Sequence, residues 1–290
     1  MKRRVWWLLA IGVVLALALA ACGGGGAAEP TADAGAAETT GETAEEPAAE
    51  EPAAAEPAAE GDKIIIKLAE NPWSASMINA NVARILLEEE LGYPVEVVTI
   101  DENAQWASLA TGDLHASLEV WPSGHAENVA QYIDQQGVVE NGGLLGPVGK
   151  IGWYIPSYMV ERNPALATYE GFADPAAAAE FATAETGDLG QFLAGDPSWV
   201  QYDADIITNL GLPLQVVNAG SEQAILAALD SAYSREEAIL FYFWTPHSIH
   251  AKYDLTEVAL PEYSDECYAT ADSGGVACDY PGDDLFKVFW

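Results

Sequence analysis

Three tryptophans occupy equivalent places in the sequence, each where a predicted β-strand ends. Trp73 follows the first such strand, Trp121 ends the third, and Trp244 ends a long apolar strand. A single tryptophan in such a place is usually a core residue. Three of them favour a shared cleft, because ligands of open α/β sheets bind beyond the carboxyl ends of the strands. Converging indole faces attract a cation, above all a quaternary ammonium group that cannot donate strong hydrogen bonds.

An aromatic cage holds only the cationic half of a zwitterion, and a carboxylate needs hydrogen-bond donors. Residues 195–199 (Gly-Asp-Pro-Ser-Trp) predict a loop that leads into a helix, whose free amides can bind an anion. The backbone amides of Ser198 and Trp199 are therefore candidate donors, and the ring of Trp199 is a candidate for the cleft wall. His125, which follows Trp121 and Pro122, is a candidate side-chain donor, with a surface or capping role as the alternative.

The elements that must position these residues alternate between strand and helix. We expect strands at 64–68, 95–100, 114–121, 214–217 and 238–244, an extended segment at 150–160, and helices at 74–91, 104–110, 175–184, 200–209 and 222–233. This order predicts an α/β fold with mainly parallel sheets. Two such units joined by extended crossings predict two lobes with a ligand cleft between them.

The lobes are expected to be discontinuous in sequence. Residues 63–149 together with 246–290 form the predicted first lobe, and residues 150–245 form the second. Asp283 and Asp284 predict the start of a last helix, with Leu285, Phe286 and Phe289 on its buried face. We expect the first lobe to need further helices beyond Trp290.

The amino-terminal part of the chain predicts export rather than folding. Residues 1–22 begin with basic residues and continue with an apolar run typical of a signal peptide. The run ends in Leu-Ala-Ala-Cys, which resembles a bacterial lipobox and implies a lipid anchor on Cys22; an uncleaved anchor helix is the alternative. Residues 23–62 contain eleven carboxylates, no Lys or Arg, and regularly spaced prolines. Such a segment cannot bury a core and predicts a disordered acidic tether.

Charge and motif content exclude several function classes. The chain of 290 residues has 45 acidic against 11 basic residues, a formal net charge of −34 that disfavours nucleic-acid binding. Cys267 and Cys278 suit a disulfide in an exported protein. His247 and His250 have helical spacing but no third metal ligand, and no nucleophile motif is evident. We therefore expect no catalysis, no metal and no cofactor.

Several longer motifs resemble the glycine betaine-binding proteins of ABC transporters. They are Asn-Pro-Trp at 71–73, Trp-Ala-Ser-Leu-Ala-Thr-Gly-Asp at 106–113, Glu-Val-Trp-Pro-Ser-Gly-His at 119–125, Gly-Trp-Tyr-Ile-Pro at 152–156 and Tyr-Phe-Trp-Thr-Pro-His at 242–247. The resemblance runs from about residue 64 to the end of the sequence. It implies a two-lobed periplasmic-binding-protein fold (type II-like) that closes on its ligand. It also implies delivery to a membrane permease that a cytoplasmic ATPase drives.

The resemblance assigns roles to particular residues. In that family an aromatic cage encloses the trimethylammonium group, and the matching positions are Trp73, Trp121 and Trp244. Backbone amides and a histidine hold the carboxylate, which implies this role for the turn of Ser198 and Trp199 and for His125. The expected function is a lipid-anchored receptor for glycine betaine in osmoprotection, with choline, proline betaine or carnitine as alternative ligands. An extracytoplasmic enzyme for a small zwitterion and a sensor ectodomain are the alternatives from other classes.

Overall fold

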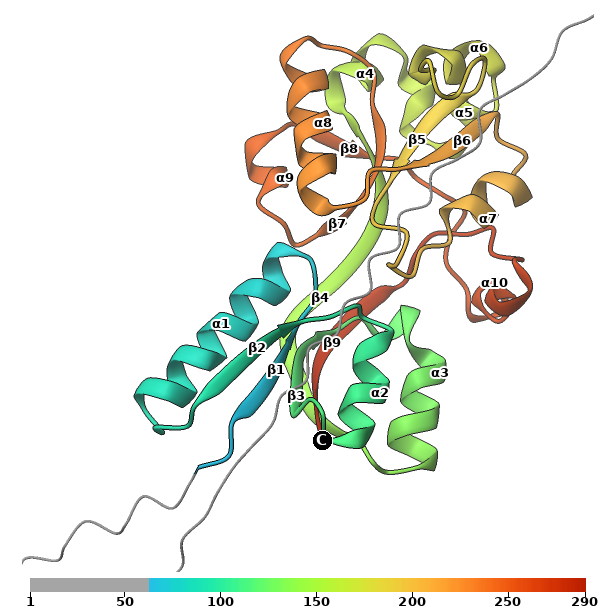
Figure 1. Cartoon of the computed structure of the whole chain (residues 1–290). Helices are drawn as coiled ribbons and strands as arrows, with labels where there is room; N and C mark the ends of the chain where they lie inside the picture. The colour runs from blue at the N-terminus through green and yellow to red at the C-terminus, as the bar shows by residue number, and fades with distance from the viewer. Residues whose placement is uncertain (1–62) are drawn as a thin grey trace, which may run out of the picture. The chain divides into compact units, whose positions relative to one another are not determined.

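One long strand, β4 (Glu140–Pro156), connects two halves of a single sheet (Figure 1). The computed structural model describes residues 63–290, in which nine strands follow the order β2-β1-β3-β9-β4-β7-β5-β6, with β8 beside β4. The amino-terminal part of β4 pairs with β9, and its carboxyl-terminal part pairs with β7 and β8. The described residues therefore form two lobes that share β4. The predicted signal peptide, Cys22 and the tether lie outside these residues.

The first lobe contains the strands at one end of the sheet. Its elements are β1 (Ile66–Glu70), β2 (Val95–Thr99), β3 (Ala116–Val120), β9 (Gly282–Phe289), α1 (Ser74–Glu89), α2 (Ala104–Thr111), the 3-10 turn η1 (Pro122–Gly124), and α3 (Ala126–Asn128), which continues as the π-helical segment η2 (Val129–Gln135). α2 and α3 cover one face of the sheet (Figure 1), where Trp106, Leu109, Phe286 and Val288 share a core.

The second lobe is larger and more apolar. Its elements are α4 (Ser157–Arg162), η3 (Pro164–Ala167), α5 (Tyr169–Phe172), α6 (Pro175–Ala178), η4 (Ala179–Phe181), β5 (Gly190–Ala194), α7 (Asp203–Asn209), β6 (Leu214–Asn218), α8 (Glu222–Ser234), β7 (Leu240–Thr245), α9 (Ile249–Lys252), β8 (Leu255–Glu257), α10 (Asp265–Tyr268) and η5 (Ala271–Ser273). As the apolar run predicted, β7 is buried almost throughout, and it lies inside the sheet with a strand paired on each side.

The α/β class predicted from the sequence is confirmed. Within each lobe the strands β1, β2 and β3, and likewise β5, β6 and β7, pair in parallel. Every antiparallel pair includes β4 or β9, the two strands in the middle of the sheet.

Two sequence predictions about the last forty-five residues were wrong. The segment from Asp283 is a strand, β9, rather than a helix, because it fills the gap between β3 and β4 and hydrogen-bonds to both. The lobe boundary also differs. Ile249, Val258 and Tyr280 pack in the core of the second lobe, β8 pairs with the end of β4, and only β9 returns to the first lobe.

Helix α1 begins and ends close to its predicted bounds, but its apolar residues are not covered. Ile78, Val82 and Leu86 are each more than half exposed, and the helix buries Ser76 and Ala80 instead. Cys267 and Cys278 form a disulfide with their Cα atoms 6.5 Å apart. Across residues 63–290, no helix has both the length and the apolarity that a membrane span requires.

Candidate functional site

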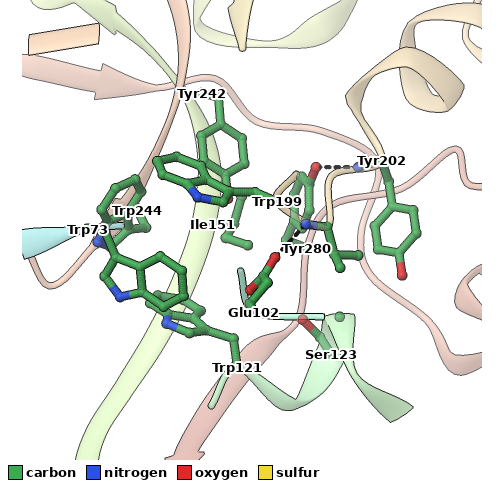
Figure 2. Close-up of a pocket in the computed structure, with 12 residues that line it drawn as sticks. Trp73, Glu102, Trp121, Ser123, Ile151, Trp199, Tyr202, Tyr242, Trp244 and Tyr280 are labelled. Atoms are coloured by element: carbon green, nitrogen blue, oxygen red, sulfur yellow. Dashed lines mark hydrogen bonds between the residues drawn. The ribbon is translucent and has the colours of Figure 1, made fainter. Parts of the chain in front are cut away.

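Four tryptophans, two from each lobe, line one pocket between the lobes. The first lobe contributes Trp73 and Trp121, and the second contributes Trp199 and Trp244. The remaining lining residues are Glu102, Ser123, Gly124, Ile151, Val200, Tyr202, Tyr242 and Tyr280. Figure 2 shows the four indoles gathered on one side of the pocket and Glu102, Ser123, Tyr202 and Tyr280 on the other. The pocket therefore has an aromatic side and a polar side.

The indoles of Trp73 and Trp244 pack edge to face against the ring of Trp199. Its ring centroid lies 6.1 Å from that of Trp73 and 5.6 Å from that of Trp244, with interplanar angles of 88° and 83°. Behind the pocket, Trp244 stacks on Phe243 at 4.3 Å. Perpendicular rings present π-faces from several directions, which suits a compact, roughly spherical cation.

Backbone geometry explains how the rings come so close. Trp73 directly precedes α1, and Trp121 directly precedes η1, so both extend from the carboxyl ends of strands. A Cβ atom at Gly149 would lie 2.4 Å from the ring of Trp121, and one at Gly195 would lie 2.3 Å from the ring of Trp199. Glycine at these two positions allows the indoles to approach the backbone this closely.

Carboxylates surround the pocket, and none of its lining residues is Lys or Arg. Glu102 lines it directly, and its Oε1 accepts a hydrogen bond of 2.7 Å from the amide of Val200. Glu119 lies behind the cage with its pKa raised, chiefly by burial. Asp283, whose pKa burial also raises, accepts hydrogen bonds from the amide and hydroxyl of Ser123. In the described residues the environment of the pocket is therefore negative, which favours a positively charged ligand group.

The predicted carboxylate donors are occupied within the protein. The amide of Ser198 donates to Oδ1 of Asp196 at 2.8 Å, and the amide of Trp199 donates to the carbonyl of Asp196 at 3.0 Å. The helix predicted to follow this loop, with Pro197 or Ser198 near its start, begins only at Asp203 as α7, so the turn and not a helix end holds both amides. His125 is buried behind the pocket, and its Nε2 lies 3.2 Å from Oε2 of Glu102.

The sequence analysis missed Glu102, Tyr242 and Tyr280 as pocket residues. A signal existed for Glu102, since it lies just beyond the carboxyl end of β2, at the same edge as Trp73 and Trp121. Trp199 was assigned mainly through its amide, whereas its ring is the group that lines the pocket. Its indole Nε1 is buried and has no hydrogen-bond partner among the described residues.

The lobes contact each other across the pocket through polar groups. The Glu102 bond to Val200 crosses from the first lobe to the second. In the opposite direction, the carboxylate of Glu222 accepts bonds of 2.6 and 2.5 Å from the amide and hydroxyl of Ser74. His247 Nε2 lies 3.0 Å from Glu222. Closure of the lobes therefore uses carboxylates that also face or flank the pocket.

Asp203, behind the pocket, should make stability depend on pH. It is fully buried, accepts hydrogen bonds from Trp153 and Tyr280, and burial raises its pKa from 3.8 to about 7. The folded state then binds this proton more tightly than the unfolded state, so the free energy of unfolding falls as pH rises between about 4 and 7. The loss from this group is about 2–4 kcal/mol. Chemical denaturation should show a shallower decline for Asp203→Asn, and equal slopes for the two proteins would contradict the assignment.

Comparison with known proteins shows that the sequence is similar to one family of binding domains and to a curated relative. Residues 65–279 match the family model described as the substrate binding domain of an ABC-type glycine betaine transport system. The trimethylamine N-oxide-binding protein of Pelagibacter ubique (strain HTCC1062) is 28% identical over 236 residues, which cover 79% of this chain and 73% of that protein.

Two solved structures share the fold at low sequence identity. Lactococcal OpuAC in a closed form with glycine betaine superposes with a TM-score of 0.57 at 20% identity, over 79% of this chain and 77% of that one. An ABC-transporter choline-binding protein in complex with choline gives 0.59 at 18% identity, over 78% and 71%. These likenesses confirm the periplasmic-binding-protein architecture.

Proposed function

The chain belongs to the family of substrate-binding domains of ABC-type glycine betaine transport systems, and from this premise we propose that it captures glycine betaine or a related methylated ammonium compound in a cage of four tryptophans. The observation that carries the proposal is the convergence of Trp73, Trp121, Trp199 and Trp244 on one acidic pocket without Lys or Arg in its lining. Each desolvated cation–π contact is worth about 2 kcal/mol. Several contacts together are enough for selective capture of a small solute.

The cage recognises what methylated ammonium compounds share. N-methyl groups make the cation apolar at its surface, so aromatic faces solvate it and hydrogen-bond donors are not needed. An unmethylated ammonium group would leave its N–H donors unsatisfied among the indoles, at a cost of about 1–3 kcal/mol each. The site should therefore separate glycine betaine from glycine by the methyl groups alone.

The end of the ligand opposite the ammonium group would face the polar side of the pocket, where the carboxylate of Glu102 lies. A ligand carboxylate on the polar side would approach the Glu102 carboxylate, while the amides of Ser198, Trp199 and Val200 are already occupied. Choline, which has a hydroxyl in place of the carboxylate, avoids this repulsion. Trimethylamine N-oxide, the ligand in the name of the Pelagibacter relative, could accept from the free indole Nε1 of Trp199. We therefore propose choline or trimethylamine N-oxide as the second candidate, and keep proline betaine and carnitine as larger alternatives.

The position in the cell follows from the family and the amino-terminal sequence. Members of the family are extracytoplasmic substrate-binding components of ABC importers. We propose that Cys22 carries the lipid anchor and that residues 23–62 form the tether, whose reach is roughly 35 Å for a flexible chain of this length. The protein would then pass its ligand to an ABC permease and its ATPase without any chemical reaction, as a component of osmoprotection.

Isothermal titration calorimetry with five ligands tests the function. We expect stoichiometric binding of glycine betaine, choline or trimethylamine N-oxide, weaker binding of proline betaine and carnitine, and none of glycine, the unmethylated control. Tighter binding of choline or trimethylamine N-oxide than of glycine betaine would favour the second candidate. Failure of all five ligands would refute the proposed function.

A further inference from the structure

A single buried carboxylate connects two of the cage indoles from behind. Glu119 lies on β3 and is 1% exposed. Its Oε1 accepts hydrogen bonds from the indole Nε1 atoms of Trp73 at 2.8 Å and Trp121 at 3.1 Å, and its Oε2 accepts from Nδ2 of Asn79 at 2.8 Å. The two indoles are remote in sequence, so this carboxylate fixes their relative orientation. Both are the first-lobe members of the cage.

The partners of Glu119 indicate that it is ionised. An ionised carboxylate only accepts hydrogen bonds, and all three partner groups are N–H donors. A protonated Glu119 would carry a donor that finds an acceptor only if the side-chain amide of Asn79 flipped and so lost its own donor contact. The carboxylate form is therefore the one that the neighbouring side chains satisfy.

Glu119 differs from Glu102 and Glu222 because no basic side chain accompanies it. Nε2 of His125 lies 3.2 Å from Oε2 of Glu102, and Nε2 of His247 lies 3.0 Å from Oε1 of Glu222. In residues 63–290, no Lys, Arg or His forms an ion pair with Glu119, and the nearby Glu222 adds repulsion. A buried charge without a counter-charge destabilises the fold. A cation in the adjacent pocket would supply the missing counter-charge.

We infer that Glu119 is the positioning and specificity residue of the cage: it orients Trp73 and Trp121 and provides the negative charge that selects a cationic ligand over an uncharged one of the same shape. This inference rests on the proposed function of the cage. The indoles alone would accept any apolar group of the right size, because π-faces pack against tert-butyl and trimethylammonium groups alike. The charge behind the rings distinguishes the two groups.

Glu119→Gln separates the charge from the geometry. The glutamine Oε1 can still accept from both indoles, and its amide can donate to Oδ1 of Asn79 if that side chain flips. We expect the affinity for choline to fall about tenfold, because the variant loses an attraction across a short, weakly screened distance. For 3,3-dimethylbutan-1-ol, in which carbon replaces the nitrogen of choline, we expect a change of less than about twofold. The same comparison applies to glycine betaine and 3,3-dimethylbutanoate.

Two further measurements make every outcome decisive. Glu96→Gln, which removes an exposed carboxylate from β2 of the same lobe, should change neither affinity. Without ligand, Glu119→Gln should unfold at the same temperature as the wild type or higher, because a lone buried charge has been removed. Equal weakening of the charged and uncharged ligands, no weakening of either, or a lower unfolding temperature would overturn the inference. A wild-type protein that binds no methylated ammonium compound would instead refute the proposed function.

Discussion

Trp199→Ala should weaken binding of the preferred methylated ammonium ligand about 30- to 150-fold, corresponding to about 2–3 kcal/mol. Trp199 is at the centre of the cage, since its ring contacts Trp73, Trp244 and Tyr242. Its removal deletes one π-face and also the support of two others. Trp121→Ala and Trp244→Ala should each weaken binding at least about tenfold, because they remove one face without loosening the rest.

Titration calorimetry and the change in tryptophan fluorescence on ligand addition would both measure this effect. Trp290→Ala is the matched control, because this tryptophan is 61% exposed and does not line the pocket. Its affinity should equal that of the wild type. If Trp199→Ala binds as tightly as Trp290→Ala, the pocket described above is not the ligand site.

The grouping of three tryptophans could be predicted from sequence because all three lie where predicted strands end. One such tryptophan is usually a core residue, but three at the same edge of a sheet indicate a shared cleft, and Trp73, Trp121 and Trp244 all line the pocket. Glu119 could not be assigned in this way. Its position on β3 predicts burial, and only the three-dimensional structure brings the indoles of Trp73 and Trp121 to the same oxygen atom.

The errors in the fold have a common cause in pairing between distant segments. Two aspartates followed by Leu285 and Phe286 are compatible with the first turn of a helix, and nothing nearby in sequence opposes that interpretation. The strand forms because β3 and β4 both present free edges, more than 120 residues away in sequence. Residues 246–281 pack with the second lobe for a similar reason, since β8 pairs with the end of β4.

Glu222 should control how much of the protein is closed. This residue begins α8 in the second lobe, and its carboxylate accepts hydrogen bonds from the amide and hydroxyl of Ser74, the first residue of α1 in the first lobe. Although burial alone would raise its pKa, hydrogen bonds from His247 and Ser74 lower the pKa of Glu222, so it accepts as an anion. Charge-assisted bonds of this kind are worth about 1.5–3 kcal/mol each.

Glu222→Gln should therefore weaken ligand binding about 10- to 30-fold without altering any cage residue, because apparent affinity scales with the fraction of molecules in the binding-competent state. Most of the change should be a faster dissociation rate, since these bonds must break before the lobes open and the ligand leaves. Small-angle scattering should show a larger radius of gyration for the ligand-free variant, and saturating ligand should restore the wild-type value.

Ser74→Ala should add little to the effect of Glu222→Gln, because both remove the same contact. Glu237→Gln, on the exposed surface of the second lobe, should change neither the affinity nor the radius of gyration. An unchanged dissociation rate in Glu222→Gln would mean that closure depends on the aromatic contacts with the ligand alone, and the contact between Ser74 and Glu222 would then have no part in retaining it.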